Sequence, residues 1–584
     1  MSAAGPGLPP IPARGLASWV PGLWVLRHYR RAWLARDAVA GLVLTSLLVP
    51  AGMGYAEAAG LPAITGLYAT VGALLAYAAF GPSRIMVLGP DSALAALIAA
   101  AVIERGAADD PARAISLAAV LAVATGLLSV AAGLVRAGFL TDLLSKPVRV
   151  GYMNGIALTV LVTQLPKLCG FSVKAADVAS GLLGFVRAAL DGKTNPLALG
   201  IGLAALVVIL GARAISAKIP GVLVAVIGAT VFVAALGLAG RLSVVGAVPR
   251  GVPVPRIPDV RAGDVWELFV ASLGIALVSF ADTSVLSRTM AGRGRYHVDP
   301  NRELVGLGLA NVVAGLFGGF PISSSASRTP VAEAAGSRTQ VTGVVGAVAI
   351  LVLLGVAPSL VANLPTAALA AVVISAALRM FDFGSVRTFF RVRRSDFALT
   401  IVAFLAVAAF GVLTGIAVAV GMSILDFVRR AWRPHDAVLG RAAGVKGYHD
   451  VRRYPGAKQV PGLLLFRWDA PLFFANADTF RERVLAEVDE ASSMITWVVV
   501  AAEPITDVDT TAAEMLEELD KELGARGAEL AFAEMKDPVK DRLERYGLQR
   551  KIGHEFFFPT VGVAVKAFLA RHPRDWTDWE EEGG

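Results

Sequence analysis

The chain has 584 residues, of which 55% are hydrophobic, and its mean hydropathy is +0.64. This composition excludes an ordinary soluble protein, and the net charge of +8 does not indicate nucleic-acid binding because the basic residues flank apolar spans. Cys169 is the only cysteine, so no internal disulfide can form and a thiol-based metal site is not expected. No set of catalytic residues is visible, and we expect neither enzyme activity nor a cofactor.

The amino-terminal residues contain no signal-peptide core. The first 26 residues are rich in proline, glycine and alanine, and a basic stretch from Arg27 to Arg36 precedes the first apolar span. We therefore expect residues 1–37 to be a cytoplasmic segment and the first span to stay in the membrane as an uncleaved anchor.

Apolar segments of about 20 residues, the length that crosses a bilayer, recur up to residue 431. Full spans are predicted near residues 38–58, 64–80, 112–133, 147–168, 196–213, 219–240, 264–290, 301–319, 338–362, 365–381, 395–411 and 412–431. Shorter helices at 90–103 and 327–335 bring the number of segments to about fourteen. The halves 38–240 and 264–431 of this transport domain, which we place at 38–432, then hold seven segments each, and an odd number makes the repeats inverted.

In each half the third segment is a short helix that follows a polar interruption of the apolar sequence. Gly89-Pro90 precedes the short helix of the first half. In the second half Pro321 prevents a continuous helix, Ser327 or a neighbouring serine is a suitable N-cap, and Pro330 falls in the first turn. Broken helices at corresponding places indicate a transporter binding site, and their free N–H groups and positive dipole ends suit an anion. The alternative is a pair of ordinary capped loops.

Basic residues gather in loops that an even number of segments places on one side of the membrane. These are Arg136, Lys146 and Arg149, Arg213, Lys218, the stretches 288–302 and 387–394, and Arg429-Arg430. The positive-inside rule makes this side cytoplasmic, together with both ends of the chain. One long loop with Arg241, Arg250, Arg256 and Arg261 disagrees, and we follow the majority.

The composition changes after residue 433, where strand-like runs alternate with helical ones. Predicted strands cover 463–468, 495–502 and 529–534, and predicted helices cover 479–488, 510–523, 538–546 and 560–570. This order predicts a small α/β domain at 433–573 with a largely parallel sheet, followed by a loose tail at 574–584.

Several motifs together carry a family resemblance. They are Val49-Pro50-Ala51-Gly52-Met53-Gly54-Tyr55-Ala56, Ser83-Arg84 with Gly89-Pro90, Gly319-Phe320-Pro321, Ser325-Ala326-Ser327-Arg328-Thr329, and Gly336-Ser337-Arg338-Thr339-Gln340. With the α/β end, the chain from about 27 to 570 resembles the sulfate permease (SulP) family with its STAS domain. The resemblance implies an α-helical polytopic membrane protein of fourteen segments in a seven-plus-seven inverted repeat, as in uracil permeases. It further implies a core domain that moves against a gate domain, often within a homodimer.

The resemblance also implies that the anion lies between the starts of segments three and ten. The expected substrate-binding residues are Tyr55, Asp91, Ser92, Ala93, Ser325, Ser327, Arg328 and Thr329. Arg328 either neutralises the anion or forms a structural ion pair with Asp91 or Asp282, and both readings stay open. Asp91 either shares the ion coupling or caps the helix dipole, and the two serines either donate to the anion or cap the helix.

Two positions depart from the family pattern. Ala51 stands where many members have glutamine, which removes one polar contact. Asp282 stands where many members have a glutamate linked to proton coupling. An aspartate at this place also occurs in sodium-coupled bicarbonate carriers, so Asp282 is expected to carry a proton or, in the alternative, to ligate sodium.

From these patterns we predict a secondary transporter of a small inorganic anion, with sulfate–proton symport as the first candidate. No ATPase motif supports primary transport, because Arg187 replaces the first glycine of the P-loop-like run that ends in Gly192-Lys193-Thr194. Sodium–bicarbonate symport, dicarboxylate transport and nucleobase transport are alternatives on the same fold. A membrane-anchored STAS signalling protein is an alternative of another class. We expect an inner (plasma) membrane location and no nucleic-acid partner.

Overall fold

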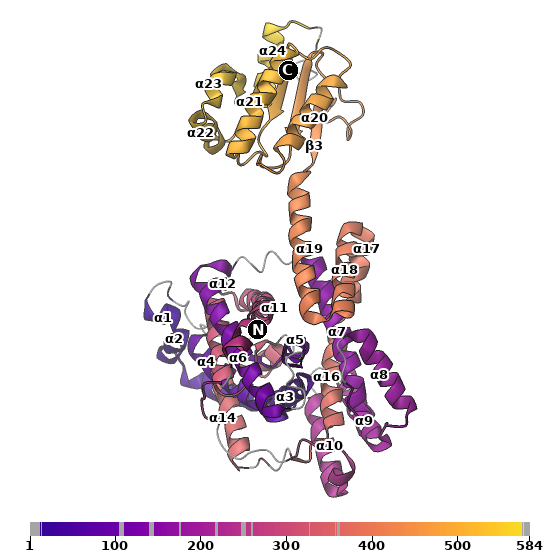
Figure 1. The fold of residues 1–584 in the computed structure, drawn as a ribbon. Coiled ribbons are helices and arrows are strands. Elements are labelled where there is room, and N and C mark those ends of the chain that lie inside the picture. The colour runs from indigo at the N-terminus through magenta and orange to yellow at the C-terminus, as the bar shows by residue number, and fades with distance from the viewer. Residues whose placement is uncertain are drawn as a thin grey trace. The chain divides into compact units, whose positions relative to one another are not determined.

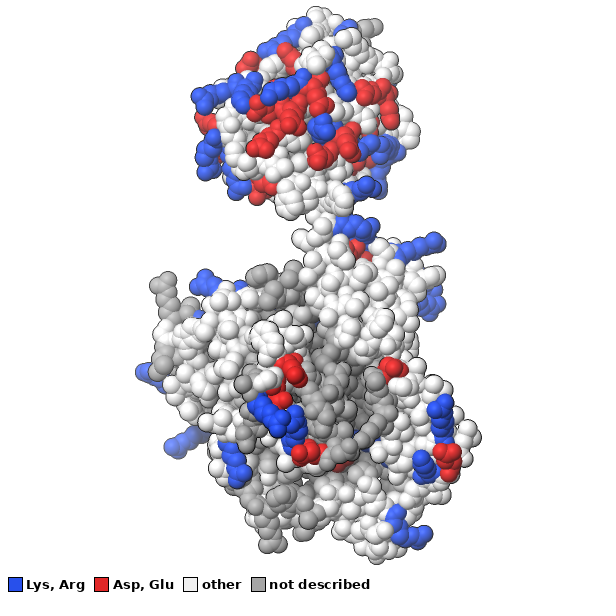
Figure 2. All heavy atoms as spheres, in the orientation of Figure 1, with Lys and Arg blue, Asp and Glu red and all other residues white. Residues whose placement is uncertain are grey.

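The computed structural model describes residues 12, 15–103, 110–138, 145–173, 177–216, 220–246, 253–258, 261–325, 328–356, 358, 362–574 and 576. The chain divides into two compact units, Met1–Ser423 and Ile424–Gly584, and each is considered by itself. The first is a bundle of helices and the second is a sheet with helices (Figure 1). Charged side chains of both signs cover the second unit, whereas most of the described surface of the first is uncharged in this view (Figure 2).

The first half of the helical unit follows the predicted segments. Its helices are α1 (Leu16–Trp19), α2 (Pro21–Arg27), α3 (Arg31–Ala58), α4 (Ala63–Phe80), α5 (Ser92–Ile103), α6 (Pro111–Leu134), α7 (Lys146–Leu168), α8 (Val178–Leu190), α9 (Pro196–Ile215) and α10 (Gly221–Ala235), followed by the 3-10 turn η2 (Leu238–Arg241). The amphipathic α8 was not predicted, because it is too short to cross a bilayer. The other helices from α3 to α10 match the seven expected segments.

The second half repeats this order. Its helices are α11 (Ala262–Gly294), α12 (Pro300–Leu316), α13 (Arg328–Ala334), α14 (Val341–Val356), α16 (Thr366–Met380), α17 (Phe383–Val392), α18 (Arg394–Phe410) and α19 (Val412–Trp432). Here α17 is the helix that was not predicted, because its arginines favoured a loop. Within the described residues, six helices are long and apolar enough to cross a membrane: Arg31–Ala58, Ala63–Phe80, Pro111–Leu134, Pro196–Ile215, Trp266–Gly294 and Thr366–Val392.

The helices pack in two groups. In one group α12 packs against α4 and α6, and α14 packs against α3 and α4. In the other group α7 packs against α16 and α18, and α9 packs against α10 and α16. Small residues allow close approach: a Cβ on Gly126 of α6 would lie 2.5 Å from the Gly308 oxygen of α12, and a Cβ on Gly308 would lie 2.6 Å from the Gly126 oxygen. Backbone contact of this kind stabilises helix pairs in membranes.

A two-stranded antiparallel sheet joins the two interruptions. In β1 (Leu88–Gly89) and β2 (Ser323–Ser324), Leu88 pairs with Ser324 and Gly89 pairs with Ser323. The Ser325 N–H also donates to the Val87 carbonyl at 3.0 Å. Pairing matters here because unpaired backbone groups are costly inside a bilayer.

Side chains satisfy the remaining backbone groups beside this small sheet. The Asn311 carboxamide accepts from the Ile322 N–H at 2.8 Å and donates to the Ile322 carbonyl at 3.2 Å. The Gln340 Nε2 donates to the Ser83 and Met86 carbonyls at 2.8 and 2.9 Å. The Asn311 and Gln340 side chains thereby hold part of the irregular backbone of both interruptions.

The carboxyl-terminal unit contains a six-stranded sheet in the order β4-β3-β5-β6-β7-β8. Its elements are β3 (Asp436–Arg441), β4 (Tyr448–Asp450), β5 (Leu463–Trp468), α20 (Ala477–Asp489), β6 (Trp497–Ala501), α21 (Thr510–Ala525), β7 (Glu529–Ala533), α22 (Asp537–Arg545), α23 (Leu548–Ile552), η3 (His554–Phe556), β8 (Phe557–Phe558) and α24 (Val561–Arg571). The strands from β5 to β8 run parallel, as predicted. The antiparallel β3 and β4 were not predicted.

Candidate functional site

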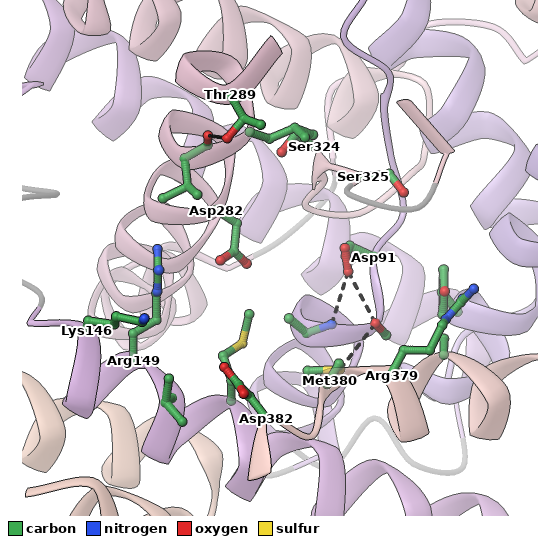
Figure 3. Close-up of a pocket in the computed structure, with 18 residues that line it drawn as sticks. Asp91, Lys146, Arg149, Asp282, Thr289, Ser324, Ser325, Arg379, Met380 and Asp382 are labelled. Carbon is green, nitrogen blue, oxygen red and sulfur yellow. Dashed lines mark hydrogen bonds between the residues drawn. The ribbon is translucent and has the colours of Figure 1, made fainter. Parts of the chain in front are cut away.

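A cavity of about 470 Å³ opens beside the two interruptions. It is lined by Tyr55, Asp91, Ser92, Ala93, Lys146, Arg149, Val150, Met153, Asp282, Val285, Leu286, Thr289, Ser324, Ser325, Ala376, Arg379, Met380 and Asp382. Figure 3 shows the labelled polar side chains around this space. The lining comes from both groups of helices, so a relative movement of the groups would change its shape.

The first interruption presents a carboxylate to the cavity. Asp91 precedes α5, and its Oδ2 accepts from the Ala93 N–H and from the Ser92 hydroxyl, each at 3.3 Å (Figure 3). The Ser92 hydroxyl also lies 3.4 Å from the Met380 sulfur of α16. Asp91 thus caps α5 while its side chain lines the cavity, and Tyr55 of α3 lines the same space.

In the second interruption Ser325 lines the cavity, whereas Arg328 does not and instead contacts the first interruption. The Ser325 hydroxyl accepts from the Arg328 N–H at 3.2 Å, so Ser325 caps α13. The Arg328 Nη2 donates to the Pro90 carbonyl at 2.5 Å, and its guanidinium carbon lies 6.0 Å from the Tyr55 ring centre. Among the described residues, the Arg328 Nε and Nη1 atoms have no hydrogen-bond partner. Arg328 therefore links the second interruption to the backbone of the first.

Not every expected site residue lines the cavity. Thr329 uses its hydroxyl to accept from the Val87 N–H at 3.1 Å, which braces the sheet of β1 and β2. Ser327 lies outside the described residues. Arg328 and Thr329 are both buried, and neither contributes to the cavity wall. The structure therefore gathers Tyr55, Asp91, Ser92, Ala93, Ser325 and Asp282 around the cavity and leaves Arg328 and Thr329 behind them.

Asp282 approaches the cavity from α11. Figure 3 shows its carboxylate directed into the space that Asp91 also faces, with Lys146 and Arg149 of α7 on the far side. Within the described residues no ion pair of 4.0 Å or less joins Arg328 to Asp91 or to Asp282. The structural ion pair considered for Arg328 is thus not formed in this conformation, and the two carboxyl groups share a cavity in which they would repel one another when both are ionised.

Three cations that were not expected at the site also line the cavity. Lys146 and Arg149 begin α7 and Arg379 ends α16, and all three contribute to the cavity wall together with Asp382. The first two were interpreted only as a topology signal. Arg379 could have been noticed as a single cation at the end of an otherwise apolar span. These cations come from α7 and α16, whereas Asp91 precedes α5 and Asp282 lies on α11.

Another buried carboxylate, Glu303, is fully hydrogen-bonded and lies outside the cavity. Glu303 of α12 accepts from the Tyr77 hydroxyl of α4, from Ser83 at 2.8 Å and from Ser287 of α11 at 2.9 Å. Its side chain is 1% exposed. Because every partner comes from a different element, Glu303 joins α4, α11 and the first interruption, a structural role that Asp282 does not share.

Known families and proteins match this chain along most of its length. Residues 34–403 match the model of the sulfate permease family, and residues 454–564 match the STAS domain. A protein of Mycobacterium tuberculosis named "Probable sulfate transporter" is 41% identical over 562 residues, which cover 96% of this chain and 100% of that protein. The Arabidopsis thaliana protein "Sulfate transporter 4.1, chloroplastic" is 29% identical, with 95% of this chain and 84% of that protein covered.

Solved structures resemble the whole fold. The structure of SLC26A9 superimposes with a TM-score of 0.88 at 21% identity and covers 97% of this chain and 94% of that chain. The murine Slc26a9 anion transporter in the inward-facing state gives the same TM-score at 22% identity, with 96% of each chain covered. The transmembrane domain of the cyanobacterial bicarbonate transporter BicA gives 0.58 at 23% identity and covers 68% of this chain and 97% of that domain. The predicted fold class, a helical membrane transporter with a carboxyl-terminal STAS domain, is confirmed.

Proposed function

The chain belongs to the sulfate permease family, and from this membership we propose that it transports sulfate across the membrane together with a proton. The family consists of membrane transporters rather than enzymes, and transport of a small anion is the function that its fold and relatives support. Two related proteins that align along most of their length bear the name sulfate transporter. Sulfate as the substrate and a proton as the coupled ion are our specific proposals.

The observation that carries the proposal is the pairing of β1 with β2 beside a cavity. The starts of α5 and α13 belong to opposite halves of the chain, and this pairing brings them next to one another. We propose that the anion binds beside Ser92, Ala93 and Ser325, which line the cavity at the two helix starts. Arg328, one layer behind, adds positive charge and holds the two interruptions together.

Proton coupling follows from the charges of the cavity. Asp91 and Asp282 are two carboxylates in a space that receives an anion. A proton on either carboxylate removes a negative charge that repels sulfate, so binding of the proton and binding of the anion favour one another. We assign the coupled proton to Asp282, with Asp91 as the group that can share it.

Sodium–bicarbonate symport is the second candidate. Asp282 favours it, since a carboxylate in a cavity can ligate sodium as well as hold a proton, and the BicA domain has a related fold. In this alternative Asp282 is a sodium ligand. Dicarboxylates are a further substrate class to test on the same fold. The alternative of another class is a STAS signalling protein that does not transport, which would show no flux.

One experiment separates these functions. The purified chain is reconstituted in liposomes, and uptake of sulfate, bicarbonate and fumarate is measured with an imposed proton gradient or sodium gradient. The proposal expects sulfate uptake that depends on the proton gradient and not on sodium. Bicarbonate uptake that requires sodium would select the second candidate. The absence of any flux from well-folded protein would favour the signalling alternative.

We also propose that both ends of the chain are cytoplasmic and that the transporter is a homodimer in the inner membrane. The basic stretch of residues 387–394 supports this sidedness. In a Cys169→Ser background, a cysteine placed at Ser385 should resist an impermeant reagent applied to intact cells. Efficient labelling from outside would contradict the proposed topology.

The STAS domain is proposed to regulate transport rather than to form the anion site. Every residue that lines the cavity precedes residue 383. A chain that ends near Arg433 should therefore bind sulfate with nearly unchanged affinity while its transport rate or yield changes. Loss of binding in a truncated chain that still runs as a single species on size exclusion would contradict this role.

A further inference from the structure

The helix α17 exposes several large apolar side chains. It has no buried residue, and the side chains of Phe383, Phe390 and Val392 are 70%, 57% and 79% exposed. Phe383 and Phe390 are seven residues apart and share one face. The apolar side chains at Val386 and Phe389 widen this face, which packs only partly against α7 and α18. An exposed apolar face of this kind marks a site that contacts another protein or a membrane.

Arginines occupy the other flank of the same helix. Arg387 and Arg391 lie one turn apart, are exposed, and are followed by the exposed Arg393 and Arg394. No acidic residue occurs from Phe383 to Arg394, and Asp396 pairs with Arg393 at 3.7 Å. Lys and Arg side chains project at the edge of the helical unit where α17 lies (Figures 1 and 2). The surface therefore combines exposed aromatic rings with the exposed cations Arg387 and Arg391.

This combination fits a negatively charged membrane surface. A short helix with a large difference between its two faces, aromatic side chains on one and arginines on the other, lies at the boundary between headgroups and acyl chains. The helix directly connects α16 and α18, which belong to the helical bundle of this membrane transporter. We propose that α17 lies in the membrane surface and that Arg387 and Arg391 bind the phosphate of an anionic phospholipid headgroup.

The helix begins at the wall of the cavity. The Asp382 carboxylate accepts from the Ser385 N–H at 2.9 Å and so caps α17, and the Asp382 N–H donates to Asn154 of α7 at 2.9 Å. The Lys146 ammonium lies 5.9 Å from the Phe389 ring centre. Asp382 and Lys146 both line the cavity. A lipid bound to α17 thus lies beside residues that form the cavity.

The helix α8 offers a matched control within the same unit. It also exposes large apolar side chains, among them Leu183 at 58% and Leu190 at 82%, but Arg187 is its only cation. Lys193 follows it in an exposed turn. Replacing Arg187 and Lys193 removes the same charge as replacing Arg387 and Arg391, at an amphipathic helix that lacks a row of arginines.

The test uses the full-length protein in lipid nanodiscs with spin-labelled phosphatidylglycerol or phosphatidylcholine, and measures the relative association of the two lipids. Wild type should prefer phosphatidylglycerol, and this preference should fall as sodium chloride rises from low to high concentration. Arg387→Gln/Arg391→Gln should weaken binding of the anionic lipid by about fivefold per arginine at low salt. Arg187→Gln/Lys193→Gln should retain the wild-type preference.

Three results would overturn the proposal. One is a wild type without preference for phosphatidylglycerol, and another is an equal loss in both double variants. Displacement of the spin-labelled lipid by millimolar inorganic phosphate would assign the arginines to a soluble anion instead. Placement of the helix is tested separately in a Cys169→Ser background. A nitroxide at Phe390→Cys should be accessible to oxygen from the lipid phase and one at Thr388→Cys to a water-soluble nickel complex; water access at both would contradict a membrane-surface helix.

Discussion

The two interruptions have the same backbone plan and opposite chemistry. Each consists of a two-residue strand that precedes a short helix, and the two strands pair with one another. The first interruption supplies a negative charge, Asp91, which faces the cavity. The second supplies a positive charge, Arg328, which is 4% exposed and donates to the Pro90 carbonyl of the first.

This difference indicates that the two interruptions contribute to the site in different ways. The inverted repeat provides two helix starts in one place, which is enough to attract an anion through backbone N–H groups. The side chains then differentiate the halves: Asp91 lines the cavity, whereas Arg328 donates from the second interruption to the Pro90 carbonyl of the first. A change in either side chain should therefore produce a distinct defect.

Filling the space between the helix starts should have the largest effect. Ala93 is 2% exposed and lines the cavity at the start of α5. Ala93→Trp should abolish measurable sulfate binding in isothermal titration, because the indole occupies the space in front of both interruptions. Ala93→Ser, which adds only a hydroxyl, should keep most of the affinity. Wild-type affinity in Ala93→Trp would show that the anion binds elsewhere.

Removing Arg328 should weaken binding without abolishing it. Arg328→Ala removes the charged hydrogen bond to the Pro90 carbonyl that holds the two interruptions together, a bond that contributes about 1.5–3 kcal/mol. Because the anion site depends on this arrangement, we expect the affinity for sulfate to fall by up to about ten- to a hundredfold. Arg328→Lys, which keeps the charge and one donor, should lose less. The comparison of the two variants by titration separates charge from positioning. If both variants bind as tightly as wild type, Arg328 does not support the site.

The two cavity carboxylates should differ in coupling. Asp282→Asn should eliminate sulfate accumulation driven by a proton gradient while sulfate–sulfate exchange continues, because the variant cannot take up the proton. Asp91→Asn should alter affinity and retain part of the accumulation. Uptake by both variants is measured in liposomes with and without the gradient. Gradient-driven accumulation at the wild-type level in Asp282→Asn would contradict the assignment of the proton.

Serine hydroxyls should contribute least. A neutral hydrogen bond contributes about 0.5–1.5 kcal/mol, so Ser92→Ala and Ser325→Ala should each lower affinity by about two- to tenfold. Ser325 also caps α13 through the Arg328 N–H, so its loss should reduce thermal stability as well. Ser327→Ala is expected to fall in the same range of affinity. A serine variant weaker than Arg328→Ala would reverse the order proposed here.

The sequence predicted the helices and both interruptions because long apolar runs and prolines are local signals. It did not predict α8 and α17, since amphipathic helices of 13 and 10 residues are shorter than a span and resemble loops when rich in arginine. The pairing of β1 with β2 could not be read from strands of two residues, because only tertiary contacts specify it. For the same reason the sequence did not reveal that Arg379 lines the cavity or that Arg328 turns toward Pro90.

The pairing of β1 with β2 also has a consequence for biosynthesis. Ser324 follows its partner Leu88 by 236 residues. At a synthesis rate of about 5–20 residues per second, the second strand leaves the ribosome roughly 12 to 47 seconds after the first. Until then β1 has no strand partner, and an unpaired backbone edge is costly inside a bilayer. We therefore expect the native arrangement of β1 to form only after the second half has been synthesised.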